Sequence, residues 1–233
     1  MAAGPTGRKR GATGCRRVQL DARVIAGHPR GNAKGPTPKG LLTKGPSMYP
    51  LIRFAKELVK FRNAPALDPL GTHVSTHMCW PWDLDPWWEL NNGRTLTLFD
   101  LGRIPLARRT GLVPILRANG WGITVAGNST RYRKRIRAFQ RFTMISRTVG
   151  WDARFVYMEQ SMWAGTECCN QVMIRSAVTS AQGIVPPARV MEALGHGPDS
   201  PPLPDWIAAW IAADATRPWP PVIPDDAKLS LPL

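Results

Sequence analysis

A stripe of apolar residues at helical spacing predicts a short helix within residues 48–62. The stripe consists of Ile52, Ala55, Leu58 and Val59, and lysine and arginine residues surround it. We expect the helix to pack on the domain. The alternative is a basic helix that lies on a membrane surface.

Alternating polar and apolar residues follow. Residues 73–80 place Val74, Thr76, Met78 and Trp80 on one face, which predicts a strand. After a loop over 81–90, a long helix begins near Asn91 and Asn92, because Asn is a favourable N-cap. This helix continues to about residue 109, with an expected kink at Pro105, and residues 112–118 form a second short helical segment.

Four strands are predicted in the second half of the chain, at about 121–137, 140–149, 154–164 and 168–181. Turn residues separate them, and a short helix follows over 187–194. The order is therefore a strand, a long helix and an antiparallel meander. A long helix beside such a sheet buries its apolar stripe on one sheet face, which predicts an α+β domain.

The chain divides into four parts by composition. Residues 1–47 contain ten Lys or Arg and one acid, Asp21, and they predict a disordered basic extension, although translation starting at Met48 is an alternative. Residues 48–71 form a helix and a linker, and 72–195 form the domain. Residues 196–233 are a Pro-rich tail with a short helix, whose apolar side consists of Trp206, Ile207, Trp210 and Ile211.

Several classes of protein are not expected. The four Cys form no CxxC pair, which favours a reducing, cytoplasmic location. No apolar run approaches the roughly 18 residues that a membrane span needs, and we do not expect membrane association. No GxSxG elbow, phosphate-binding loop or HExxH motif occurs. Residues 1–47 carry +9 of the net charge of +15, and the remaining +6 suits an anionic ligand, but no nucleic-acid-binding motif accompanies it.

The segment over residues 82–92, WDLDPWWELNN, carries the candidate chemistry. It resembles the loop-to-helix motif of hotdog-fold thioesterases, including the group related to hydroxybenzoyl-CoA thioesterase. Asp85 occupies the position of that motif's catalytic Asp, and Asn91 and Asn92 occupy its Asn pair. Glu89 stands where the motif has a His. The resemblance extends over about residues 72–195, through segments such as 99–103, 131–133 and 150–159.

The resemblance implies a hotdog fold, in which a curved antiparallel sheet wraps a long helix. It also implies hydrolysis of an acyl thioester, such as an acyl-CoA, to an acid and a thiol, at a site in a homodimer interface. No cofactor or metal is implied. Glu89 in place of His keeps a second possibility open, a hotdog protein that binds acyl groups without hydrolysing them.

Elementary chemistry is compatible with a catalytic Asp85. A carboxylate near a helix N-terminus can act as base or nucleophile while free backbone N–H groups there stabilise the oxyanion. Considered without the resemblance, Asp83 and Asp85 are better explained as residues that stabilise a turn. We predict that substrate contacts involve Asn91, Asn92, Glu89, Arg131 and Arg133, although Asn91 and Asn92 are also typical helix caps.

Two further clusters have a functional and a structural explanation. Arg131, Arg133, Arg135 and Arg137 alternate along a predicted strand. They could bind the phosphates of coenzyme A, or they could form a solvated outer face. His73, His77 and Cys79 share one strand face at a spacing compatible with a metal, but no fourth ligand is evident. We therefore expect a structural role for these three residues.

Overall fold

The computed structural model describes residues 49–224, which contain one six-stranded antiparallel sheet and five α-helices. The predicted basic extension over 1–47 and the end of the tail lie outside the described residues. In chain order, the elements are α1 (Leu51–Lys60), β1 (Thr72–Met78), the 3-10 helix η2 (Pro81–Asp83), α2 (Asn92–Arg109), α3 (Leu112–Ala118), β2 (Gly122–Tyr132), β3 (Arg141–Trp151), β4 (Val156–Ala164), β5 (Glu167–Ser180), β6 (Gly183–Val185), α4 (Pro187–Ala193) and α5 (Asp205–Asp214).

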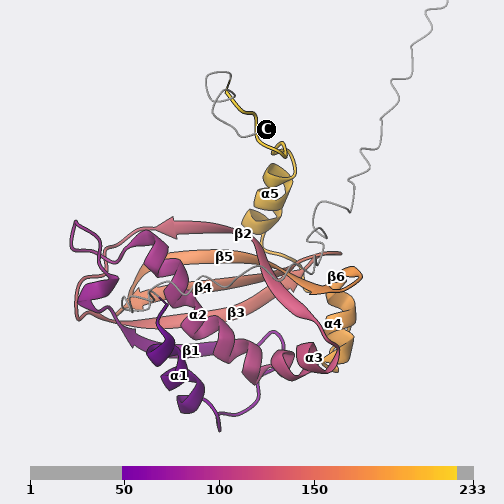
Figure 1. Ribbon diagram of the computed structural model, residues 1–233, viewed down its shortest axis with the longest axis horizontal. Coiled ribbons are helices and arrows are strands. Elements are labelled where there is room, and N and C mark those ends of the chain that lie inside the picture. Colours follow the sequence, from indigo (N-terminus) through magenta and orange to yellow (C-terminus); the bar gives the residue numbers. More distant parts are fainter. Residues whose placement is uncertain (1–48, 225–233) are drawn as a thin grey trace, which may run out of the picture. The chain divides into compact units, whose positions relative to one another are not determined.

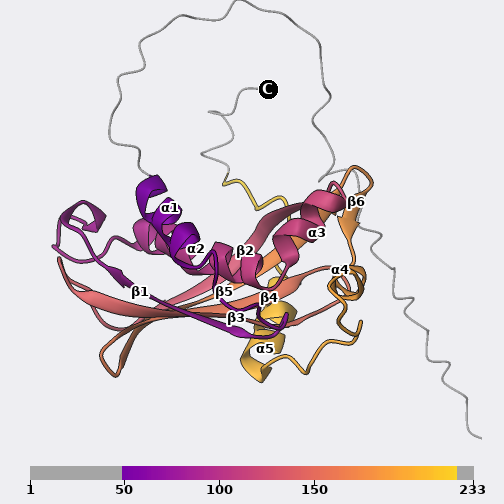
Figure 2. The same ribbon diagram turned by 90° about the horizontal axis from the view of Figure 1, so that it is seen from below.

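The sheet has the strand order β1-β3-β4-β5-β2, and β6 pairs with the end of β5 beyond β4 (Figure 1). Its register shifts at three places, between Val125 and Gly127, between Thr148 and Gly150, and at Met162. Such bulges increase the bending of a strand. The sheet curls around the helices on its inner side (Figure 2).

The long helix α2 packs on β1, β3 and β4 from the inner side of the sheet. It buries Leu98, Phe99, Leu101 and Leu106 in the main core, and it continues through Pro105 without interruption. At Gly102 the helix approaches β3 closely. A Cβ there would lie 2.5 Å from the Ser146 Oγ and 2.6 Å from the Met144 Sδ. A helix wrapped by a curved antiparallel sheet confirms the predicted α+β hotdog fold.

A buried polar residue also connects α2 to the sheet. The side chain of Gln160 in β4 donates to the Phe99 carbonyl oxygen and to the Ser146 Oγ, both at 2.8 Å. Gln160 and Ser146 are fully buried. Since a buried amide without partners is costly, these bonds favour a single position of the helix on the sheet.

The tail helix α5 docks on the outer side of the sheet (Figure 2). Its Ile207 is fully buried against Tyr157 and Met173, whose side chains point away from α2. The Arg175 guanidinium lies 4.8 Å from the Trp210 ring and pairs with Asp214 at 2.8 Å. Over β4 and β5 the sheet is therefore covered on both faces.

The helix α1 forms where predicted and packs on the domain, but it does not pack through its apolar stripe. Ile52, Ala55 and Val59 are exposed, and Leu58 is half-buried. The fully buried residue of α1 is instead Glu57. Among helices in residues 49–224, none is long and apolar enough to cross a membrane.

Two strands also differ from their predicted form. The strand β2 ends at Tyr132, so Arg135 and Arg137 lie in the following loop, not on a common strand face. The strand β1 alternates as expected, but the face that it buries is the polar one, with His73, Ser75 and His77. Burial therefore follows the partners available in the fold, not the apolarity of a face alone.

Candidate active site

Asp83 anchors the loop over residues 82–90 that precedes α2, here called the acidic loop. Its carboxylate is fully buried and accepts from the Arg53 Nη1 and from the Arg94 Nε, both at 2.6 Å. It also accepts from the Trp80 backbone N–H at 3.0 Å. Because Arg53 lies in α1 and Arg94 in α2, this one carboxylate joins the loop to both helices, which is a structural role.

Asp85 lies two residues further on, in a tight turn closed by the bridge between Leu84 and Leu90. It is half-buried, and its Oδ1 accepts from the backbone N–H of Trp87 at 2.9 Å and of Glu89 at 3.4 Å. The backbone of Trp88 adopts a left-handed φ of 61° to complete the turn. The turn thus fixes the orientation of the Asp85 carboxylate beside two exposed tryptophans.

The two predicted Asn residues lie at the N-terminus of α2. Asn91 is the N-cap, and its Oδ1 accepts from the Arg94 backbone N–H at 3.0 Å. Asn92 is the first helical residue, and its carbonyl oxygen accepts from the Tyr132 hydroxyl at 3.2 Å. Capping therefore explains Asn91, while contact of either residue with a substrate stays a prediction.

Glu89, at the position of the motif's His, pairs with Arg135. The Arg135 Nε lies 2.6 Å from the Glu89 Oε2. The pair places a cation against the Glu89 carboxylate, four residues after Asp85. Arg135 also connects the acidic loop to the basic residues that follow β2.

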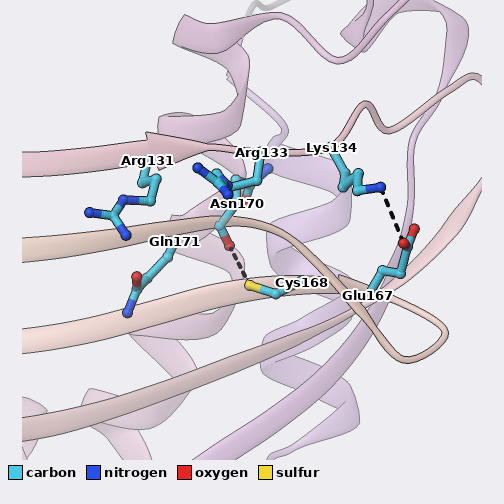
Figure 3. A pocket seen from close by; sticks show the side chains of 7 residues that line it. All are labelled: Arg131, Arg133, Lys134, Glu167, Cys168, Asn170 and Gln171. Carbon is cyan, nitrogen blue, oxygen red and sulfur yellow. Dashed lines mark hydrogen bonds and ion pairs between the residues drawn. The ribbon is translucent and has the colours of Figure 1, made fainter.

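A basic recess of about 560 Å³ opens at the end of β2 (Figure 3). It is lined by Arg131, Arg133, Lys134, Glu167, Cys168, Asn170 and Gln171. An adjoining recess of about 570 Å³ shares Arg133 and Lys134 and adds Arg135 and Arg137. The arginines predicted to share one strand face therefore gather around two neighbouring recesses, where guanidinium groups can bind phosphate.

An apolar cavity of about 300 Å³ lies between the C-terminal half of α2 and the sheet. Its apolar walls include Ile104, Leu106, Ile123, Val125, Val178, Val190, Met191 and Leu194. Sequence reasoning did not locate this cavity, because its lining comes from α2, α3, α4 and four strands. On α2 its lining begins at Asp100, about 12 Å along the helix from Asn92 at the usual helical rise.

The buried polar face of β1 meets α1. The Ser75 Oγ and the His77 Nε2 lie 2.8 Å apart, and the His77 Nδ1 lies 3.9 Å from the Glu57 Oε1. Burial lowers the pKa of His77 to about 3, so the imidazole is neutral at physiological pH. Burial likewise lowers the pKa of His73 to about 4, and its Nδ1 lies 3.0 Å from the Arg109 Nη1.

These contacts give the predicted metal-compatible histidines structural partners. Within residues 49–224, no group of three or more His, Cys, Asp or Glu side chains is placed to hold a metal ion. Sequence reasoning missed Glu57 as a member of this cluster, since its position in a surface-like helix gave no sign of burial.

Comparisons with known proteins point to one family. A family model described as the thioesterase-like superfamily matches residues 79–211. Protein THEM6 of Xenopus laevis is 28% identical over 164 residues, which cover 69% of this chain and 77% of that protein. Protein THEM6 of Drosophila melanogaster is 27% identical over 128 residues, which cover 54% of this chain and 64% of that protein.

Solved structures share the fold. The probable thioesterase YbaW from Escherichia coli has a TM-score of 0.50 at 14% identity, over 52% of this chain and 96% of that one. A candidate oleoyl thioesterase from Lactobacillus plantarum has a TM-score of 0.51 at 13% identity, over 67% of this chain and 59% of that one. At this level of identity, the structures support the fold alone.

Proposed function

The chain belongs to the thioesterase-like superfamily, and from this premise we propose that it hydrolyses an acyl thioester, such as an acyl-CoA, to a free acid and a thiol. Asp85 acts as the general base or as the nucleophile. The backbone N–H groups at the start of α2 stabilise the oxyanion, because a helix N-terminus presents unpaired donors. A thiolate leaves readily, so the reaction makes little demand on a general acid.

One observation carries the proposal: the half-buried Asp85 carboxylate is held by two backbone amides in the turn that leads into α2. A carboxylate whose orientation is already fixed can attack the thioester carbonyl, or deprotonate a water molecule, without an entropic cost for ordering the side chain. Asp83 does not meet this description, since both of its oxygens are bound by arginines inside the protein.

The surroundings suit the two ends of an acyl-CoA. Arg131 and Arg133, with the loop cations after β2, favour its phosphates, and the apolar cavity favours its acyl chain. These features lie toward opposite ends of α2 within one chain. This separation is a reason to propose a homodimer, because hotdog thioesterases, by resemblance, place their sites at subunit interfaces.

A second candidate function is acyl binding without hydrolysis. The ion pair between Glu89 and Arg135 favours this function. At the position of the motif's His, the chain has a carboxylate that is paired with a cation. The Asp85 Oδ1 also stabilises its own turn, a role that needs no catalysis.

The test compares Asp85→Asn with Asp68→Asn in a thiol-release assay over acyl-CoA substrates of increasing chain length. Asp68 is a matched control, because its Oδ1 accepts from the Leu70 N–H at 2.8 Å in the same kind of turn. Asn preserves such turns, so each variant loses a charge and keeps its geometry. We expect kcat to fall at least about 100-fold for Asp85→Asn and to be unchanged for Asp68→Asn.

Two outcomes contradict the proposal. Full activity of Asp85→Asn would remove Asp85 from the reaction. Saturable binding of acyl-CoA by the parent protein, with no thiol released for any chain length, would establish the acyl-binding function instead.

A further inference from the structure

The helix α1 presents its apolar side to solvent. Ile52 is 88% exposed, Val59 is 62% exposed and Leu51 is 56% exposed. Ala55 lies between them on the same side and is exposed as well. Removal of these aliphatic side chains from water would be favourable. An apolar face that points to solvent on a packed helix therefore indicates an interaction surface.

Buried polar contacts fix α1 in this orientation. Arg53 reaches inward to the Asp83 carboxylate at 2.6 Å and to the Met78 carbonyl oxygen at 2.9 Å. Glu57, one turn later, is 1% exposed and faces His77. Rotating the helix to bury Ile52 and Val59 would bring Arg53 and Glu57 into solvent and leave Asp83 without one of its cations, which is costly inside a protein.

The charges beside the apolar stripe are all positive. Lys56, Lys60 and Arg62 are exposed along the outer side of α1 and the turn that follows it. The acid of the helix, Glu57, points inward and contributes no negative charge to this surface. The outer side of α1 therefore combines exposed aliphatic side chains with a cationic border.

We propose that the outer side of α1 docks on a membrane surface that contains anionic lipid. A helix that lies in the bilayer interface buries its aliphatic side chains among the acyl chains, while flanking Lys and Arg meet the headgroups. This revises the expectation that the chain does not associate with membranes. It is independent of the proposed thioester hydrolysis, since none of these residues contacts Asp85.

The charge argues for lipid over a second copy of the chain. Two α1 helices that met through this side would bring Lys56 and Lys60 of one copy close to the same cations of the other. Like charges at a desolvated contact are unfavourable, whereas an anionic leaflet attracts each cation. Exposed Trp82, next to the Asp83 that holds Arg53, adds a residue type that is enriched at membrane–water interfaces.

The test is co-sedimentation of the full chain with vesicles of phosphatidylcholine, with and without phosphatidylserine. We expect binding to the phosphatidylserine vesicles, and Ile52→Asp with Val59→Asp to reduce the partition coefficient at least tenfold. Lys56→Gln with Lys60→Gln removes two cations and should reduce it by roughly 25-fold, at about fivefold for each charge. Val222→Asp with Ile223→Asp is the matched control, because it adds the same two charges at exposed aliphatic side chains outside α1.

All of these proteins keep residues 1–47, so vesicle binding through that basic segment is equal in each. Equal partitioning of the parent and the Ile52/Val59 double variant would overturn the proposal. So would a double variant that loses self-association, measured by sedimentation, while it binds vesicles like the parent. A thermal unfolding midpoint equal to that of the parent is required of each variant, and lost partitioning with retained folding supports the proposal.

Discussion

Asp83 and Asp85 are two residues apart and belong to the same acidic loop, yet they lie in different environments. Asp83 is fully buried between two arginines, and Asp85 is half-buried at the turn. The sequence identifies both as turn-forming acids and identifies Asn91 as a cap, because these roles depend on neighbouring residues. It does not identify Arg53 as a partner of Asp83, because that contact joins residues 30 positions apart.

At Asp83 we predict a loss of stability. Asp83→Asn removes the charge that compensates Arg53 and Arg94, and breaking a buried ion pair from one side typically costs about 3–5 kcal/mol. The free energy of unfolding, measured by chemical denaturation, should therefore fall by about 3 kcal/mol or more. Asp85→Asn should stay within about 0.5 kcal/mol of the parent, as is usual for substitutions away from buried networks. Equal stabilities of the two variants would contradict the structural role given to Asp83.

At the scale of elements, the sequence predicted α1 and β1 but not the faces that they bury. Periodicity shows that two faces of an element differ, and the partners of the fold decide which face turns inward. Arg53 and Glu57 face inward because their partners, Asp83 and His77, lie inside the domain. The apolar side of α1 therefore faces solvent. On β1, the face that turns toward α1 and the core carries His73, Ser75 and His77, and Val74 on the other face is half exposed. A pattern read from one element alone lacks this information.

This packing of α1 on β1 predicts an acid-sensitive fold. The pKa of His77 is about 3 in the folded protein, against about 6.5 in an unfolded chain, because burial disfavours the charged imidazole. Between about pH 6.5 and pH 3, the unfolded chain therefore binds a proton that the folded chain does not. The free energy of unfolding should fall by about 1.4 kcal/mol per pH unit for this residue.

His77→Gln isolates that contribution in denaturation curves recorded from about pH 7 to about pH 4. Burial raises the pKa of Glu57, which opposes the trend, but this effect is present in both proteins and largely cancels in the comparison. We expect the variant to lose stability less steeply than the parent as the pH falls. Parallel curves for the parent and His77→Gln would refute the assignment.

At the scale of the whole molecule, the order of the elements was sufficient to predict an α+β domain, and the resemblance implied the hotdog fold. It was not sufficient for the recesses and the apolar cavity, because these depend on where the sheet bends. The bulge at Ala126, between Val125 and Gly127, is an example: its position follows from pairing with β5 and not from a local signal. The sequence also placed Arg135 and Arg137 on a strand that ends before them.

The proposed homodimer can be tested at the two edges of the sheet. β2 is an 11-residue edge strand that is exposed over much of its length, and unpaired edges favour pairing with another chain. We expect a dimer in sedimentation velocity, and Val125→Lys should raise the dissociation constant at least tenfold. Val74→Lys on the opposite edge is the control, since Val74 and Val125 are 50% and 47% exposed. A monomeric parent protein would contradict the proposal.

The docking of α5 also determines how this protein can be shortened. Ile207 covers Tyr157 and Met173, and Asp214 pairs with Arg175 on the same side of the sheet. A recombinant fragment that stops after α4 would expose Tyr157 and Met173 to solvent and leave Arg175 without Asp214 as its counter-ion. The minimal unit for biophysical work therefore extends to at least residue 214, beyond the last strand and well into the Pro-rich region.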